Sequence, residues 1–316
     1  MKKRRLLIAG ILILTGFFLY AILVTSIRQK TVSIPYSMNM VQDQLSDIRN
    51  VAKWWAPFSG MDSNAIRFSY SGNDKLNAGD HSITIEKSNS LNTWYTVLEK
   101  ENKQLFEFSI LPDTGGHCQL VLQYETTLWK RIIGNDPLLK EAMKSLDDMN
   151  DYLRDKKKLY GFEIEETLVT DTTFLFKSIT VSNAEKKEGM GRLFTDLMNY
   201  AKEKNAGYNG IRIFYSSQIS KDSITLFASI GISNSQVSTH ENGPVFFKRM
   251  PYKKNLLVAY YQGKFGELDK AYKALQLFKK DFGLNSMAIP FTKFLTDGYA
   301  FDDNQVIQAV VCYPVF

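Results

Sequence analysis

The chain has 316 residues, of which 44% are hydrophobic and 13% aromatic, so it can build two domains with buried cores and is not a disordered, collagen-like or solenoid protein. Its formal net charge of +6 comes entirely from the first 30 residues. The remainder has 33 basic and 33 acidic residues, which gives no support for a nucleic-acid partner.

Residues 1–30 predict a basic cytoplasmic tip followed by a membrane anchor. Leu6 to Val24 is a run of 19 residues without charge, and as a helix it would reach about 28 Å, close to the hydrocarbon thickness of a bilayer. Lys2 to Arg5 precede the run, and positive charges stay on the cytoplasmic side. We therefore expect a single-pass protein of a bacterial inner membrane with its C-terminal domains in the periplasm. The alternative is a cleaved signal peptide, for which only the poor site Val24-Thr25-Ser26 is present.

Residues 31–160 predict an α+β domain. An extended piece over Thr31–Tyr36 and helix-like sequence over Val41–Trp55 come first. Apolar and polar residues then alternate, which predicts antiparallel strands with one buried face, around Ile83–Ile85, Trp94–Leu98, Phe106–Ile110 and Leu120–Tyr124. A long amphipathic helix over about Pro137–Lys157 is expected to bury one stripe on this sheet.

The same segment resembles the helix-grip fold of the START-like, polyketide-cyclase-like (SRPBCC) superfamily. The stretch Leu45-Ser46-Asp47-Ile48-Arg49-Asn50-Val51-Ala52-Lys53-Trp54-Trp55 is similar to that superfamily's pattern of Leu, Asp and Asn ahead of a Trp pair. The resemblance implies an apolar cavity between sheet and long helix that holds lipids, polyketides or other hydrophobic molecules. The alternative is a filled, structural interior, and for the two tryptophans core packing is preferred over ligand stacking.

Residues 161–316 contain an internal repeat of two βαββ units. The first is predicted as a strand, a helix and two strands over Thr173–Ile179, about Glu188–Asn205, Gly210–Ser216 and Ser223–Ile232. The second is predicted over Asn255–Gln262, about Gly266–Phe282, Ser286–Leu295 and Gln305–Val315. Ile211 and Ala288, at equivalent positions, are 77 residues apart, and a tandem repeat explains this spacing.

This pair resembles the GyrI-like small-molecule-binding domain, the effector-binding domain of some AraC-type transcription activators. The stretch Tyr261–Leu268 is similar to that family's strand–Gly–helix junction, and Val311–Val315 is similar to its C-terminal strand. Many members carry a Glu in the penultimate strand that meets cationic ligands or serves hydrolysis. Thr292 stands at that position here, with Phe294 at the family's Tyr, so the resemblance implies a neutral, apolar or aromatic ligand.

The cleft between the two repeats is the predicted ligand site. Residues of the inner strands are expected to line it: Tyr215, Tyr261, Thr292, Phe294 and Tyr313. The alternative is that these side chains fill the space between the repeats. The preferred function is a membrane-anchored, non-catalytic protein that senses or sequesters a small hydrophobic or aromatic molecule. A hydrolase or cyclase acting in one of two cavities, and an adaptor for peptide or protein surfaces, remain alternatives.

No catalytic residue, metal or cofactor is predicted. The three histidines lack partners at metal-ligand spacing and are expected on the surface or in loops: His81, His117 and His240. Gly189 and Gly191 lie inside a predicted helix and lack the third glycine of a dinucleotide-binding loop. Cys118 and Cys312 fall in different predicted domains and are interpreted as two small buried side chains outside any disulfide framework.

Overall fold

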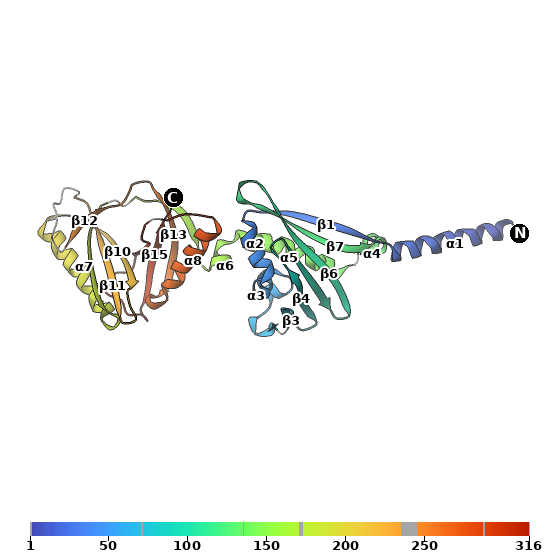
Figure 1. Cartoon of the computed structure of the whole chain (residues 1–316), viewed down its shortest axis with the longest axis horizontal. Helices are drawn as coiled ribbons and strands as arrows, with labels where there is room; N and C mark the ends of the chain where they lie inside the picture. Colours follow the sequence, from blue (N-terminus) through green and yellow to red (C-terminus); the bar gives the residue numbers. More distant parts are fainter. Residues whose placement is uncertain are drawn as a thin grey trace. The chain divides into compact units, whose positions relative to one another are not determined.

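The computed structural model describes residues 2–70, 72–134, 136–170, 173–234, 245–286 and 288–315, except for the side chains of residues 2–10, 12 and 133. The chain divides into two compact units, Met1–Asp155 and Lys156–Phe316. Each unit contains one antiparallel sheet with helices packed against it (Figure 1). The predicted α+β class is confirmed.

The first unit begins with helix α1 (Lys2–Leu23), which leads directly into strand β1 (Thr25–Ile34). The strand starts earlier than the extended piece predicted from Thr31, because Thr25 already pairs with Thr127 of the neighbouring strand. No helix among the described residues is long and apolar enough to cross a membrane. The transmembrane anchor predicted over Leu6–Val24 is therefore not found.

Seven strands in the order β1-β7-β6-β5-β4-β3-β2 form the sheet of the first unit. Their further bounds are β2 (Arg67–Ser69), β3 (Lys75–Ala78), β4 (His81–Ser88), β5 (Asn92–Glu99), β6 (Asn102–Pro112) and β7 (Cys118–Thr127). Neighbouring strands pair antiparallel throughout, as the alternating sequence predicts.

Four further helices complete the first unit: α2 (Met38–Ser46), α3 (Ile48–Trp54), α4 (Leu128–Ile133) and α5 (Pro137–Arg154). The single helix predicted over 41–55 is in fact α2 and α3. Asp47 separates them because its backbone is extended (φ −103°, ψ 114°) and its carboxylate accepts the Arg49 amide at the start of α3. The long predicted helix ends at Arg154, and the short helix α6 (Lys156–Tyr160) follows in the second unit.

Eight strands in the order β12-β9-β11-β10-β14-β15-β13-β8 form the sheet of the second unit. Their bounds are β8 (Ile164–Leu168), β9 (Thr173–Ser182), β10 (Tyr208–Gln218), β11 (Ser223–Ile232), β12 (Phe246–Arg249), β13 (Asn255–Lys264), β14 (Phe291–Phe294) and β15 (Val306–Pro314). Helix α7 (Lys186–Glu203) packs on β9 and β11, and helix α8 (Asp269–Asp281) packs on β13 and β15 (Figure 1). Short 3₁₀ turns in the two units lie at Phe58–Gly60, Ser63–Ala65, Thr114–Gly116, Asn183–Glu185 and Phe265–Glu267.

The two βαββ repeats are present, but their spacing differs from the predicted 77 residues. The first strands begin 82 residues apart, at Thr173 and Asn255, and the helices begin 83 apart, at Lys186 and Asp269. The predicted value of 77 paired Ile211 with Ala288, but Ala288 lies before β14, which begins at Phe291, five residues later than predicted. Strands β8 and β12 add to the two ends of the sheet and were not predicted.

Helices α7 and α8 pack on one face of the second sheet and not on the other. Strand residues that face α7 and α8 join one large core, which includes Leu226 and Ala228 of β11 and Leu257 and Ala259 of β13. The residues between them on the same strands point to the opposite face, which we call the open face. A second apolar cluster lies there: Val169, Phe174, Ile213, Leu256, Val258, Phe291 and Cys312.

Candidate ligand-binding site

Aromatic rings fill the interior of the first unit, where the START-like resemblance implies a cavity. Five of them are each at most 1% exposed: Trp54, Trp55, Tyr95, Phe106 and Phe108. Trp55 has its ring centroid 5.5 Å from that of Tyr95 and 5.8 Å from that of Phe108. The Tyr95 hydroxyl donates a hydrogen bond to the Leu45 carbonyl. Core packing, the preferred interpretation of the tryptophan pair, is confirmed.

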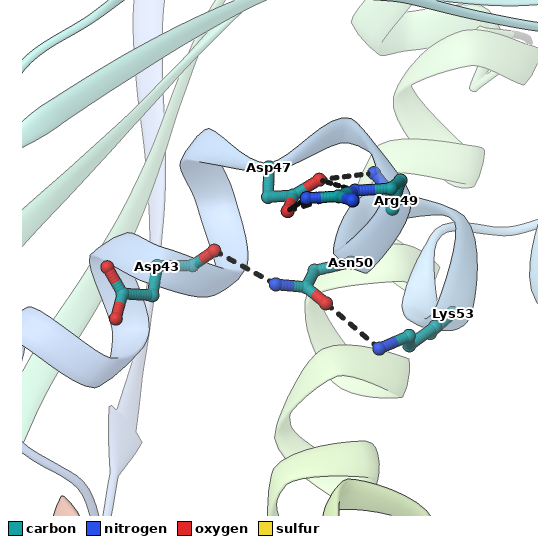
Figure 2. A network of polar contacts seen from close by, with 5 residues as sticks. All are labelled: Asp43, Asp47, Arg49, Asn50 and Lys53. Atoms are coloured by element: carbon teal, nitrogen blue, oxygen red, sulfur yellow. Dashed lines mark hydrogen bonds and ion pairs between the residues drawn. The ribbon is translucent and has the colours of Figure 1, made fainter. Parts of the chain in front are cut away.

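The polar residues of the same sequence motif hold the α2–α3 junction (Figure 2). Arg49 Nη2 lies 2.6 Å from Asp47 Oδ2, and the ion pair lowers the pKa of Asp47, with the Arg49 side-chain hydrogen bond as its main cause. Asn50 donates to the Asp43 carbonyl at 3.1 Å and accepts from Lys53 at 2.9 Å. The polar groups of the motif therefore bond to one another and to the backbone at the α2–α3 junction, and this positions the two tryptophans.

Sequence reasoning missed a carboxylate–imidazole–carboxylate group in the first unit. His81 Nδ1 lies 3.6 Å from Glu141 Oε2, and His81 Nε2 lies 3.9 Å from Glu99 Oε1. Trp55 Nε1 donates to Glu141 at 2.8 Å, yet burial raises the pKa of Glu141. His81 and Glu99 are cross-strand partners on β4 and β5, whereas Glu141 lies on α5. The three residues are far apart in the sequence, so no local spacing predicts the group.

At 3.6 Å and 3.9 Å these are ion-pair distances and not hydrogen bonds, and the group is not arranged as a metal centre. Within the described ranges, no cluster of three or more His, Cys, Asp or Glu side chains could hold a metal ion. Cys118 and Cys312 are both buried, as predicted. His240 lies outside the described residues.

In the second unit, a cleft of about 230 Å³ lies between α8 and the central strands β10 and β14. Thr292 is fully buried beside it, and its hydroxyl lies 2.7 Å from the hydroxyl of Tyr272 on α8. Burial raises the pKa of Tyr272 well above its ordinary value. Both Tyr215 and Thr292 line this central cleft, and the ring centroids of Tyr215 and Tyr272 are 6.4 Å apart.

The other three predicted site residues lie outside the lining of the central cleft. Phe294 is 3% exposed, and its ring packs against four others: Phe194, Phe214, Phe265 and Phe301. Tyr261 is 6% exposed and donates its hydroxyl hydrogen to the Lys264 carbonyl. Tyr313 lies beneath Lys279, whose ammonium is 4.6 Å from the ring centroid. The structure thus brings two of the five residues together.

A larger hollow of about 360 Å³ lies on the open face, and we call it the open-face pocket. Its apolar wall comes from five strands, the segment after β12 and the segment before β14, and includes Phe176, Ile213, Tyr215, Phe227, Met250, Ile289, Pro290, Phe291 and Pro314. Phe176 and Phe227 are nearly parallel, with ring centroids 6.3 Å apart. Tyr215 and Pro290 line both this pocket and the central cleft.

The apolar surface continues past the pocket. A second hollow of about 320 Å³ shares four lining residues with it: Val169, Ile213, Met250 and Phe291. A sequence signal for this face exists in β11, where the stretch Leu226–Ile232 is apolar at nearly every position. Strands that are apolar on both sides are expected to be covered on both sides.

No family model and no curated protein matches the chain. Among solved structures, it is similar to EcmrR in a complex with DNA, with 14% identity over 60% of this chain and 70% of that chain, at a TM-score of 0.41. It is also similar to a hydrolase from Listeria innocua, with 14% identity over 52% of this chain and 98% of that chain, at a TM-score of 0.36. A START superfamily protein from Mycobacterium smegmatis is similar at 14% identity over 40% of this chain and 98% of that chain, with a TM-score of 0.28.

A seven-stranded antiparallel sheet with a long C-terminal helix is compatible with a helix-grip fold, and two βαββ repeats in one sheet are compatible with a GyrI-like domain.

Proposed function

We propose that the second unit binds a small apolar or aromatic molecule in the open-face pocket and does not transform it. The observation that carries the proposal is a hollow of about 360 Å³ with a largely apolar and aromatic wall. Ligand pockets in proteins range from about 300 to 1,000 Å³ and have mostly apolar walls with a few polar groups.

The pocket rings are available to a ligand. Phe176, Phe227 and Tyr215 are only half-buried, and their mutual contacts hold them as a wall on one side of the hollow. Aromatic walls favour flat ligands, because ring faces stack in offset arrangements. By contrast, the Phe294 cluster facing the helices is already packed ring against ring.

Calorimetric titration of the full-length protein with 2-naphthamide, a flat neutral probe, tests the proposal. We expect saturable binding that weakens about tenfold in Phe227→Ala, since loss of an aromatic contact costs on the order of 1 kcal/mol. Leu277→Ala is the matched control: Leu277 is 46% exposed on α8, and its removal should leave binding unchanged. Equal binding by both variants would rule out the pocket.

We further propose that α1 anchors the chain in a bacterial inner membrane, with both units on the periplasmic side. Lys2 to Arg5 precede the charge-free run Leu6–Val24, as the positive-inside rule requires. Large apolar side chains of α1 are highly exposed, with Ile13, Leu14 and Leu23 each 70–72% accessible. Such side chains gain free energy from a hydrocarbon surrounding.

Membrane fractionation with protease treatment of spheroplasts tests the anchor. We expect the protein in the membrane fraction, with residues 31–316 digested by protease added outside. Replacing Leu14 by Arg should release part of the protein from membranes, whereas Leu14→Ile should not. Full protection from protease, or a soluble product that begins near Ser26, would contradict the topology.

A further inference from the structure

We infer that the molecule held in the open-face pocket is an anion with an apolar or aromatic body, such as an aromatic carboxylate. This inference rests on the proposed function of the pocket and goes beyond it by naming the charge of the ligand. It departs from the neutral ligand that Thr292 suggests, because Thr292 lines the central cleft and not the open-face pocket.

The pocket has a one-sided charge. Lys248, Arg249 and Lys254 line it, and no aspartate or glutamate is among the described residues that line it. Composition does not explain this imbalance, because residues 31–316 carry 33 basic and 33 acidic side chains. The central cleft of the same unit, by comparison, is lined by one cation and one anion, Lys186 and Asp269.

Within the described part of the chain, no carboxylate forms an ion pair with any of the three cations. Other lysines of the second unit meet aspartates: Lys177 meets Asp196 at 2.5 Å, and Lys187 meets Asp302 at 2.7 Å. Among the residues that the structure describes, no such ion pair forms at Lys248, Arg249 or Lys254. Each of the three side chains is exposed, so its charge can meet a ligand at low cost in desolvation, and Arg249 also lies over the Phe247 ring with its guanidinium 5.5 Å from the ring centroid.

Strand geometry places Lys248 beside the aromatic wall. On β12, Lys248 pairs with Phe174 and Phe246 pairs with Phe176, and alternation sends Lys248 to the same open face as these rings. The Lys248 ammonium lies 5.2 Å from the ring centroid of Phe176. A flat anion that stacks in the pocket would therefore meet a positive group at the edge of its apolar contact.

The physical consequence is a preference that follows the charge of the ligand. A carboxylate, sulfonate or phosphate ester accepts charge-assisted hydrogen bonds from lysine and arginine, while the ring wall takes up its apolar body. A neutral analogue keeps the apolar contact alone. A cationic analogue loses affinity through repulsion by three like charges.

Three probes with the same bicyclic body separate these effects: 2-naphthoate, 2-naphthamide and 2-naphthylmethylammonium. By calorimetry in low-salt buffer, we expect 2-naphthoate to bind about tenfold more tightly than 2-naphthamide, because each exposed rim charge contributes about 0.2–1 kcal/mol. The ammonium probe should bind most weakly. Added salt should narrow the difference, because it screens exposed charges.

Variants that remove the charges test whether these three residues cause the preference for 2-naphthoate. Replacing Lys248, Arg249 and Lys254 together by Gln should abolish the preference for 2-naphthoate over 2-naphthamide. Lys248→Gln should reduce the preference, and Lys248→Arg should retain it. Lys202→Gln is the matched control, since Lys202 is exposed on α7 and its loss removes the same charge away from the pocket.

The outcomes distinguish the inference from the function on which it rests. If none of the three probes binds, the pocket is not a ligand site and the proposed function fails. If 2-naphthamide binds as tightly as 2-naphthoate, or if the preference survives in the triple variant, the inference is wrong while the proposed function stands. Since the three cations are exposed, melting curves of the variants should match that of the native protein.

Discussion

The two sheets of this molecule use aromatic residues in opposite ways. In β6 of the first unit, Phe106 and Phe108 face the interior and are fully buried, whereas Leu105 and Glu107 face the outside. In β11 of the second unit, every other residue is apolar and faces the helices. Phe227, on the opposite side of the strand, is apolar as well. A strand that is apolar on one side buries that side in the core. A strand that is apolar on both sides leaves a second apolar surface that a ligand can cover.

The hollow on the outer face of the first sheet and the pocket on the open face of the second sheet also differ in the charges that line them. A hollow of about 420 Å³ on the outer face of the first sheet is lined by charges of both signs, including Lys103, Lys130, Glu107 and Glu125. Such a surface is well solvated and has little to gain from an apolar ligand. Among its described lining residues, the open-face pocket has an apolar wall and only cationic charges, so the two hollows differ in their chemistry more than in their volume.

The largest expected effect separates filled aromatic clusters from the pocket wall. Phe294→Ala should lower the free energy of unfolding of the second unit by about 3–5 kcal/mol, because it empties a site packed by four rings. Binding of 2-naphthoate, measured below the unfolding temperature, should change little. A small loss of stability together with lost binding would place the ligand in the Phe294 cluster and overturn the comparison.

A pocket residue should show the reverse pattern. Phe227 is half-buried, so Phe227→Ala should cost only about 1–2 kcal/mol of unfolding free energy. Its affinity for 2-naphthoate should fall about tenfold. Denaturation followed by circular dichroism checks the first value, and calorimetry checks the second. A stability loss as large as that of Phe294→Ala would mean that the open-face rings are core.

The α2–α3 junction allows a finer test in the first unit. Asp47→Ala removes both the helix cap and the ion pair, and should cost about 1 kcal/mol, whereas Asp47→Asn keeps a capping oxygen and should cost less than about 0.5 kcal/mol. All four tryptophans lie in the first unit, so urea denaturation followed by tryptophan fluorescence reads this unit alone. Equal losses in the two variants would show that the ion pair matters more than the cap.

The same carboxylate gives a pH dependence of definite sign. Because the pKa of Asp47 is lowered in the folded state, its contribution is present above the ordinary value of 3.8 and is lost as the pH falls through the lowered pKa. Asp47→Asn should therefore be most destabilising near neutral pH and indistinguishable from the native protein in strong acid.

How much the sequence predicts depends on how local the determining contacts are. Alternation located the strands of the first sheet, and the βαββ order of the second half was read correctly, because both signals repeat within a few residues. The break at Asp47 was missed, although an Asp at this position is a capping signal. The predicted site residues Tyr215 and Thr292 both line the central cleft, whereas Phe294 packs against four rings from distant segments, which no local pattern predicts. The open-face pocket depends on β12, a four-residue strand with no periodic signal of its own.

The smallest expected effect concerns Glu141, the buried carboxylate of the first unit. Its pKa is raised above 4.5 mainly by burial. The hydrogen bond from Trp55 and the nearby His81 side chain oppose this shift only in part, and Glu99 adds to it. A raised folded-state pKa means that stability is fully present below about pH 4.5 and is lost as the pH rises through the raised pKa.

Glu141→Gln keeps an oxygen for the Trp55 indole and removes the buried charge, so it should stabilise the first unit at pH 8 by less than about 1 kcal/mol and have no effect at pH 4. Tryptophan-monitored urea denaturation at the two pH values measures the difference. Loss of stability at pH 8 would instead show that the charge of Glu141 is needed in the folded state.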